Sequence, residues 1–157
     1  MTLAAQVVDA AIAKGVTITT AESCTGGLVS AALTDIAGSS AVFERGFVTY
    51  SNAAKVAMVR VNPATLDAFG AVSEQVAEQM ARGARQSASA DIAVSITGIA
   101  GPGGSDHKPE GRVCFGLDVG GDVQTVTHEF GALGRAQVRI RSVQTALTLL
   151  QGALESL

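Results

Sequence analysis

The segment Thr19–Gly27, which reads TTAESCTGG, combines hydroxyl, thiol and glycine residues in a pattern that suits nucleophilic chemistry. It follows a β-branched run at 16–21, which predicts a strand, and precedes a predicted helix at 25–36. A strand-to-helix turn of this kind lies at the carboxyl edge of an α/β sheet, where ligands usually bind. Ser23 or Cys24 could therefore be a nucleophile, with free amides at the helix start stabilising an oxyanion. The alternative is a plain helix N-cap, in which a Ser or Thr side chain satisfies those amides.

The segment Tyr50–Lys55 (YSNAAK) supplies a candidate base for that nucleophile. We expect Asn52 to cap a short helix, which puts Lys55 at the third helical position. A cation there opposes the helix dipole by about 0.3–1 kcal/mol, so burial would have to supply most of the energy that makes the amine neutral. A neutral Lys55 could take the proton of Ser23, while Tyr50, the only tyrosine in the chain, relays or orients that proton. The alternative is a solvated lysine beside a tyrosine at the edge of the core.

A glycine-rich loop at Thr97–Ser105 (TGIAGPGGS) follows a predicted strand at 91–97 and could present backbone amides to a phosphate. The loop matches neither a Walker A sequence nor a G-x-G-x-x-G fingerprint, so a plain crossover turn is the alternative. Later in the chain, Arg135 and Arg139 stand four residues apart at the start of the last predicted helix and so share a face. They could hold a phosphate or a carboxylate, although solvated arginines are the more frequent outcome.

Composition and charge exclude several classes of function. The net charge is −3, which gives no basic field for binding nucleic acid. His107 and His128 are isolated and lack the spacing of a metal site, so we expect neither a metal nor a cofactor. Cys24 and Cys114 lie in different contexts and predict no disulfide framework. No apolar run is long enough for a membrane span, and the first residues lack the features of a signal peptide, which predicts a soluble cytoplasmic protein.

The elements that must position these residues alternate between helix and strand within one domain, residues 1–157. The pattern predicts a three-layer α/β/α sandwich with a mixed, mostly parallel sheet. Because the chain is 47% hydrophobic but only 4% aromatic, its core must be built from Ala, Val, Leu and Ile. The expected elements are helices near 3–12, 25–36, 52–60 and 63–70, a long helix after Ser73, a C-terminal helix, strands near 16–21, 43–50 and 91–97, and a hairpin of 112–119 and 123–130.

Taken in order, the candidate segments resemble one known family, the C-terminal domain of CinA, the competence/damage-inducible protein family. Its stand-alone members include nicotinamide-nucleotide amidase. The resemblance covers nearly the whole chain, and its first two motifs are highly specific. The matching segments are Thr20–Gly27, Gly38–Ser40, Phe43–Asn52 with Lys55, Gly70–Ser73, Thr97–Pro102, Lys108–Pro109, and Phe130–Gly131 with Arg135 and Arg139.

The resemblance implies an α/β/α sandwich that deamidates nicotinamide mononucleotide to nicotinic acid mononucleotide and ammonia, in pyridine nucleotide recycling. It also implies a serine amidase with Ser23, Lys55 and Tyr50 as catalytic residues, a small-molecule nucleotide as partner, and a homo-oligomer. Glycines in the first turn would let a substrate approach the backbone closely. The substrate-binding residues that we expect are Glu22, Cys24, Thr25, Gly26, Gly27, Thr97, Gly98, Gly101, Arg135 and Arg139.

Two departures from the family pattern bear on this hypothesis. The loop Gly101–Gly111 is one residue shorter before Lys108 than is common in the family, and Glu110 replaces a valine. Both leave the catalytic residues untouched but bear on the substrate contacts of the loop. Many members also carry an N-terminal nucleotide pyrophosphatase domain, and we expect no such activity from this chain. The alternatives are a catalytically silent nucleotide-binding module and a Ser/Lys amidase for another amide.

Overall fold

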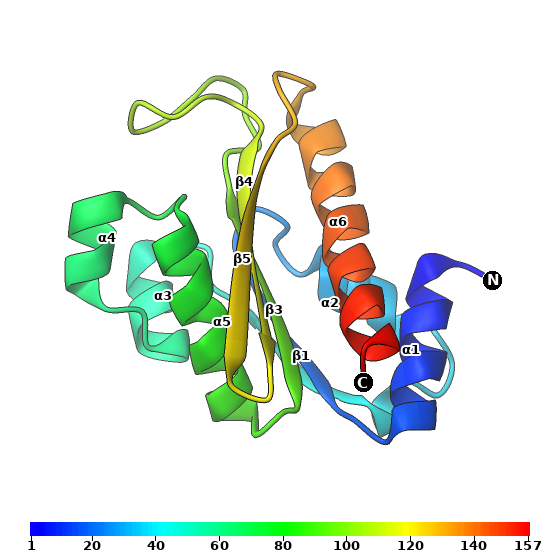
Figure 1. Ribbon diagram of the computed structural model, residues 1–157. Helices are drawn as coiled ribbons and strands as arrows, with labels where there is room; N and C mark the ends of the chain where they lie inside the picture. Colours follow the sequence, from blue (N-terminus) through cyan, green and yellow to red (C-terminus); the bar gives the residue numbers. More distant parts are fainter.

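The computed structural model describes all 157 residues as a five-stranded sheet with helices on both faces (Figure 1). The strands are β1 (Ile18–Glu22), β2 (Phe43–Val48), β3 (Ile92–Gly98), β4 (Arg112–Val119) and β5 (Asp122–Glu129). The helices are α1 (Leu3–Lys14), α2 (Leu28–Thr34), a short 3₁₀ turn at Ser39–Ala41, α3 (Asn52–Val59), α4 (Pro63–Phe69), α5 (Glu74–Ala88) and α6 (Arg135–Glu155).

The sheet is mixed, as the sequence predicts. Its strand order is β2-β1-β3-β4-β5, with β1 parallel to both β2 and β3, and with β4 antiparallel to both β3 and β5. Four strands therefore run in one direction and β4 runs against them. Helices α1, α2 and α6 lie on one face and α3, α4 and α5 on the other, which gives the predicted three layers (Figure 1). Because β1, β2 and β3 are parallel, their carboxyl ends lie at the same edge of the sheet.

The predicted helices and strands are all present, but α2 begins later than expected. The sequence predicted a helix from Thr25, whereas the regular helix starts at Leu28. The cause is the glycine pair before it, because Gly26 and Gly27 have φ of 58° and 104°. These left-handed values suit glycine and cannot continue a right-handed helix. Residues 23–27 therefore form a separate tight turn between β1 and α2.

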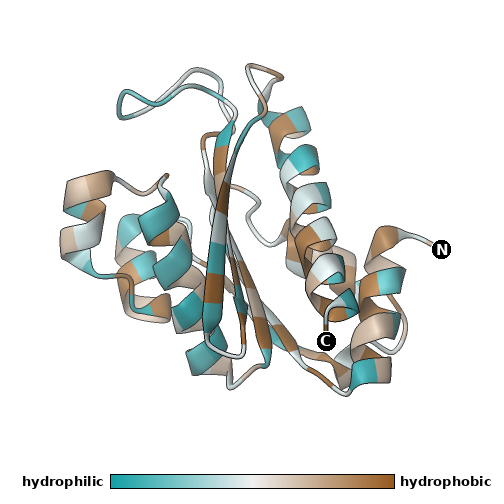
Figure 2. Cartoon of the chain, viewed as in Figure 1, coloured by the Kyte–Doolittle hydropathy of each residue, from teal (hydrophilic) through white to brown (hydrophobic).

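The core is built almost wholly from small and branched aliphatic residues, as the composition predicts. A cluster of 20 buried residues fills the layer between the sheet and α1, α2 and α6, and a cluster of seven lies beneath α3 and α5. Phe115 is the one aromatic residue among them. The part of α5 that faces the viewer in Figure 2 is mainly hydrophilic, which agrees with a helix that buries only one side. None of the helices is long and apolar enough to cross a membrane.

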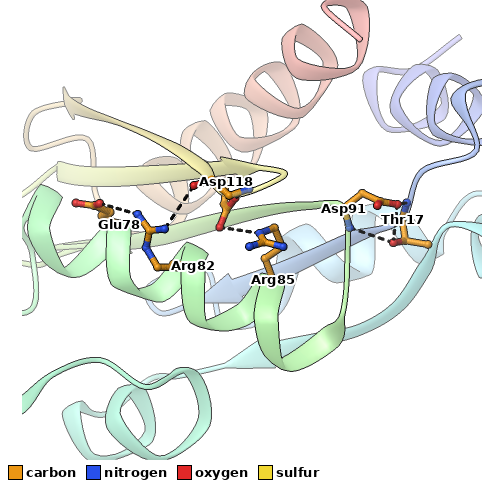
Figure 3. A network of polar contacts seen from close by, with 7 residues as sticks. Thr17, Glu78, Arg82, Arg85, Asp91 and Asp118 are labelled. Carbon is orange, nitrogen blue, oxygen red and sulfur yellow. Dashed lines mark hydrogen bonds and ion pairs between the residues drawn. The ribbon is translucent and has the colours of Figure 1, made fainter.

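A buried ion pair fastens α5 to the hairpin (Figure 3). Arg85 Nε lies 2.9 Å from Asp118 Oδ2, and the Asp118 carboxylate is fully buried. The amide of Gly121 donates to the other Asp118 oxygen at 2.7 Å, so the same carboxylate also fixes the turn between β4 and β5. On the exposed side of α5, Arg82 pairs with Glu78 at 3.1 Å. The buried pair holds the antiparallel half of the sheet against the helix layer.

Glu22, the last residue of β1, is a buried carboxylate that anchors the start of α2. It is 0% exposed and accepts hydrogen bonds from the Val29 and Ser30 amides, both at 2.9 Å. The hydroxyls of Thr25 and Ser30 donate to it at 2.7 and 2.8 Å. These four hydrogen bonds replace the water that would otherwise hydrate the Glu22 carboxylate. Glu22 therefore fixes the turn at residues 23–27 from the α2 side.

We expect Glu22→Gln to lower the free energy of unfolding by about 3 kcal/mol, because the new amide group would face buried N–H donors that need an acceptor. Urea denaturation of the variant and the parent measures the loss. The matched control is Glu78→Gln, which removes a half-exposed ion pair and should cost less than about 1 kcal/mol. A Glu22→Gln loss no larger than that of the control would contradict the anchoring role.

Candidate active site

Three connections meet at the carboxyl edge of the parallel strands and enclose a cleft of about 330 Å³. They are the turn after β1, the segment between β2 and α3, and the loop 99–111 between β3 and β4. Ser23 follows β1 and its amide donates to Ile96 O of β3 at 2.9 Å. The cleft therefore opens where the chain leaves β1 toward one side and β3 toward the other, the usual ligand position in an α/β sheet.

The structure brings eight of the predicted site residues into this cleft and leaves five outside it. The eight that line the cleft are Ser23, Cys24, Tyr50, Lys55, Thr97, Gly98, Gly101 and Arg135. The five that do not line it are Glu22, Thr25, Gly26, Gly27 and Arg139. Glu22 faces α2, and the two glycines make the turn rather than a surface for substrate. We therefore reassign the side chains of Glu22, Thr25 and Arg139, together with the two glycines, from substrate contact to the support of the turn.

Ser23 and Lys55 form the central contact of the cleft. Lys55 Nζ donates to Ser23 Oγ at 3.2 Å and to the Thr49 carbonyl at 3.1 Å. Ser23 is 7% exposed and Lys55 only 2%. The lysine thus lies inside the protein with its amine at the serine hydroxyl, although the two residues are 32 positions apart in the chain.

The cap of α3 differs from the predicted one by a residue. The sequence predicted Asn52 as N-cap, but the Ser51 hydroxyl fills this position and accepts from the Ala54 amide at 3.0 Å. The Ser51 backbone is extended, as an N-cap requires, and a serine oxygen reaches the third amide as readily as an asparagine oxygen. Lys55 consequently lies at the fourth helical position instead of the third, and Asn52 is free to line the cleft.

The surroundings of Lys55 favour its uncharged form. Burial lowers the pKa of the Lys55 amine, and proximity to the Cys24 thiol opposes this shift only in part. None of the ion pairs in the protein includes Lys55. A buried amine without a carboxylate partner loses its hydration and gains no compensating charge, so the neutral form becomes the stable one at a lower pH than usual.

Cys24 has the opposite electrostatics. Burial raises the pKa of the Cys24 thiol to about 12, which keeps it protonated at neutral pH. A thiol is a poor nucleophile compared with its thiolate. Of the two candidate nucleophiles, Ser23 is therefore the one with a base in contact and Cys24 the one whose reactive form is suppressed.

The turn after Ser23 also presents amides without partners. The Ser23 carbonyl accepts from the Gly26 amide at 2.9 Å, whereas the amides of Cys24 and Thr25 donate no hydrogen bond within the protein. Both residues are buried, at 5% and 0% exposure. Unpaired buried amides are rare in folded proteins, and two in succession beside a hydroxyl suit the binding of an oxyanion.

Tyr50 and Arg135 stand together at the mouth of the cleft. Arg135 Nη2 donates to the Tyr50 hydroxyl at 2.6 Å, and its Nη1 donates to the Gly101 carbonyl at 2.8 Å. Tyr50 is 58% exposed and makes no hydrogen bond with Ser23 or Lys55. The tyrosine therefore shares the cleft with the serine and lysine, but its hydroxyl is engaged with the arginine.

The glycine-rich loop is held in place by two charged residues that the sequence reasoning did not assign. Lys108 Nζ donates to the carbonyls of Phe69 and Val72, both at 2.6 Å, which joins the loop to the connection between α4 and α5. Glu110 accepts from the Gly103 amide at 2.6 Å and from the Gly134 amide at 3.2 Å. Glu110 thus ties the loop to the start of α6. For Lys108 and Glu110 alike, the sequence feature that could have indicated this role is a charged side chain within a glycine-rich loop.

Thr97 closes the floor of the cleft. Its hydroxyl donates to the Ala71 carbonyl at 2.8 Å, and the side chain is 1% exposed. Ala71 and Val72 line the cleft beside it; both belong to the segment Gly70–Ser73 that matches the family, but no site role was predicted for them. No group of three or more His, Cys, Asp or Glu side chains is placed to hold a metal ion. The chemistry available in the cleft is that of a hydroxyl, an amine, backbone amides and a guanidinium.

Known proteins match this chain over almost its full length. The model of the CinA C-terminal domain matches residues 1–154. "Nicotinamide-nucleotide amidohydrolase PncC" of Escherichia coli strain K12 is 52% identical over 158 residues, covering 99% of this chain and 96% of that protein. The protein of the same name from Enterobacter agglomerans is 55% identical over 140 residues, 86% of this chain and 85% of that one. A CinA-like protein of Chlorobium phaeobacteroides is 50% identical, and this chain spans 35% of its length.

Solved structures also match this chain over nearly its full length. The CinA superfamily protein KP700603 of Klebsiella pneumoniae superposes with a TM-score of 0.95 at 38% identity, covering 99% of this chain and 97% of that one. The competence/damage inducible protein CihA of Agrobacterium tumefaciens gives a TM-score of 0.93 at 48% identity, covering 96% and 93%. Because the family model, the relatives and the folds agree over nearly all of its residues, the chain belongs to the CinA C-terminal domain family.

Proposed function

We propose that this protein deamidates nicotinamide mononucleotide, releasing nicotinic acid mononucleotide and ammonia. The protein is an amidohydrolase, in keeping with relatives at 52% and 55% identity that are named nicotinamide-nucleotide amidohydrolases. The observation that carries the mechanism is the contact of 3.2 Å between Lys55 Nζ and Ser23 Oγ, in a position where burial lowers the pKa of the lysine. A hydroxyl paired with an uncharged amine is an activated nucleophile.

The reaction begins with attack of Ser23 Oγ on the carboxamide carbon. The neutral Lys55 amine takes the hydroxyl proton across the 3.2 Å contact, and the carbonyl electron pair moves to oxygen. The amides of Cys24 and Thr25 stabilise that oxyanion. Lys55, now an ammonium, gives its proton to the leaving nitrogen, and the C–N bond breaks to release ammonia and leave an ester on Ser23. Water, deprotonated by Lys55, then attacks the ester and frees the carboxylic acid and the serine.

The nucleotide part of the substrate is proposed to lie along the glycine-rich loop. Arg135 is the guanidinium of the cleft, and a planar guanidinium suits phosphate oxygens. Lys108 and Arg135 both line the cleft, and each already donates to two oxygens of the protein. An ammonium has three N–H donors and a guanidinium five, so Arg135 keeps more donors for a phosphate than Lys108 does. Thr97, Gly98 and Gly101 form the surface beneath the ribose and ring. This arrangement fits a small phosphorylated amide better than a peptide.

The setting of the reaction follows from the substrate. We propose that the protein works in pyridine nucleotide recycling in the cytoplasm, with the mononucleotide as its partner, and that it assembles as a homo-oligomer. Exposed apolar side chains on α6 and its flanks, among them Leu133, Ile140 and Leu157, support the proposed assembly. Sedimentation of the purified protein gives the oligomeric state, and a monomer at micromolar concentration would remove this part of the proposal.

We expect Ser23→Ala to lower kcat for ammonia release from nicotinamide mononucleotide by about 10⁴-fold or more, because the acyl-enzyme can no longer form. Cys24→Ala should keep activity within about tenfold, since its protonated thiol takes no part in the transfer. A coupled assay for ammonia measures both, with retained circular dichroism as control. Activity lost only in Cys24→Ala would reassign the nucleophile. Nucleotide binding without turnover in the parent would make the protein a silent binding module.

We expect kcat/KM to rise with pH along a single ionisation that lies below the ordinary range of a lysine. Burial lowers the pKa of Lys55, so the neutral base is present above that lowered value and is lost as the pH falls through it. Below it, kcat/KM should fall about tenfold per pH unit. Lys55→Met should lose activity and the ionisation together. If the pH dependence survived in the residual activity of Lys55→Met, another group would be the base.

We expect Tyr50→Phe to raise KM by about tenfold while kcat changes less than about threefold, because its hydroxyl holds Arg135 and does not contact the reacting pair. The proton relay proposed for Tyr50 from the sequence predicts the reverse. Steady-state kinetics with nicotinamide mononucleotide separate the two roles. A fall in kcat at constant KM would restore the relay, which would then require the side chain to turn away from Arg135 during the reaction.

A further inference from the structure

Two consecutive carbonyls after Ser23 point at one side chain from the far end of the chain. Arg139 Nε donates to the Cys24 carbonyl at 3.1 Å, and its Nη2 donates to the Thr25 carbonyl at 3.3 Å. Arg139 lies on the first turns of α6, more than 110 residues away in sequence, and is half-buried. It makes no ion pair, so these carbonyls are its polar partners.

Because each peptide unit is planar, a hydrogen bond that holds its carbonyl also fixes the direction of its amide N–H. In a trans peptide unit the carbonyl and the amide hydrogen point in opposite directions. The Cys24 carbonyl shares its unit with the Thr25 amide, so a carbonyl held by Arg139 fixes that amide pointing away from the arginine. The Ser23 carbonyl, held by the Gly26 amide at 2.9 Å, fixes the Cys24 amide in the same way. The two unpartnered amides are thus aimed by hydrogen bonds on the carbonyls of their own units.

Without these hydrogen bonds, the peptide units of the turn could rotate. Gly26 and Gly27 have φ of 58° and 104°, and glycines resist reorientation of the neighbouring peptide units less than other residues do. Glu22 restrains the α2 side of the turn through the Thr25 hydroxyl and the Val29 amide. No other side chain holds the Cys24 carbonyl. Arg139 is therefore the restraint on the side of α6.

A guanidinium suits this task better than an ammonium. Its donors lie in one plane at fixed spacing, so Nε and Nη2 reach two successive carbonyls at once. Arg139 does not line the cleft, so it touches neither the substrate nor the reacting atoms.

We propose that Arg139 is a positioning residue for the oxyanion site, which keeps the Cys24 and Thr25 amides aimed at the developing negative charge by holding the carbonyls of the turn. This inference rests on the proposed acyl transfer at Ser23. It replaces the role in substrate binding that the sequence suggested for Arg139. We therefore expect Arg139 to lower the free energy of the transition state, because the oxyanion that the amides stabilise carries its charge only there.

The kinetic test compares Arg139→Gln, Arg139→Lys and the parent with nicotinamide mononucleotide. We expect Arg139→Gln to lower kcat by about 10–100-fold with KM within about twofold, and Arg139→Lys to recover part of the loss. The matched control is Arg141→Gln, the same change at an exposed position on the same helix, which should behave as the parent. Thermal denaturation of each variant shows whether it is folded at the assay temperature. A rise in KM at constant kcat would overturn the proposal in favour of substrate binding.

A second measurement separates this inference from the choice of substrate. A fluorophosphonate reacts with an activated serine: Ser23 Oγ bonds to phosphorus, fluoride leaves, and Lys55 takes the proton, while charge builds on the phosphonyl oxygen. Mass spectrometry of the intact protein gives the rate of labelling. We expect about tenfold slower labelling of Ser23 in Arg139→Gln than in Arg141→Gln.

The two measurements give distinct outcomes. If the parent releases no ammonia from the mononucleotide but labels at Ser23 faster than Arg139→Gln does, the proposed function fails and the role of Arg139 stands. If the parent and Arg139→Gln label at the same rate, the positioning role is wrong whatever the substrate. If the parent does not label at Ser23, the serine is not activated, and both proposals fail.

Discussion

The structure of the cleft depends on a lysine amine buried without a carboxylate. Burying such an amine charged would cost several kcal/mol, so its uncharged form is favoured only while no anion lies close to it. The protein meets this condition although Glu22 is adjacent to Ser23 in the chain. Four donors from the turn and α2 surround the Glu22 carboxylate, and its charge is directed away from the cleft. The acidic residue nearest the nucleophile therefore supports the turn and leaves Lys55 unpaired.

The turn after β1 is consequently held from two sides by opposite charges. Glu22 accepts from its amides and hydroxyls, whereas Arg139 donates to its carbonyls. Neither contact uses the amides of Cys24 and Thr25, which stay free. An enzyme that stabilises an oxyanion gains most when its donors are fixed before the reaction, because no reorganisation is then needed as charge develops. Two charged residues that do not line the cleft thus restrain a turn whose amides carry no formal charge.

Periodicity and turn chemistry were enough to predict the layers, the hairpin and the edge where Ser23 and Lys55 meet. They could not predict which side of the turn each neighbouring residue faces. Glu22 and Arg139 were predicted to bind the substrate because they lie in the same motifs as residues that line the cleft. Their orientation depends on where β1 ends and how α2 begins, and the left-handed φ of Gly26 and Gly27 sets the latter. Local rules describe one element at a time, whereas these contacts join elements that are distant in sequence.

The loop 99–111 shows the same limit of prediction from local sequence. Its glycines suggested that it could present backbone amides to a phosphate. In the structure, three charged residues hold it: Lys108 contacts the end of α4, Glu110 contacts the start of α6, and Arg135 contacts the Gly101 carbonyl. A loop fixed in this way loses little entropy when a ligand arrives. Glu110, which the sequence analysis noted as a departure from the common family pattern, tethers the loop through the Gly103 and Gly134 amides. The contacts with α4 and with the start of α6 thus fix the position of a loop that lines the same cleft as Ser23.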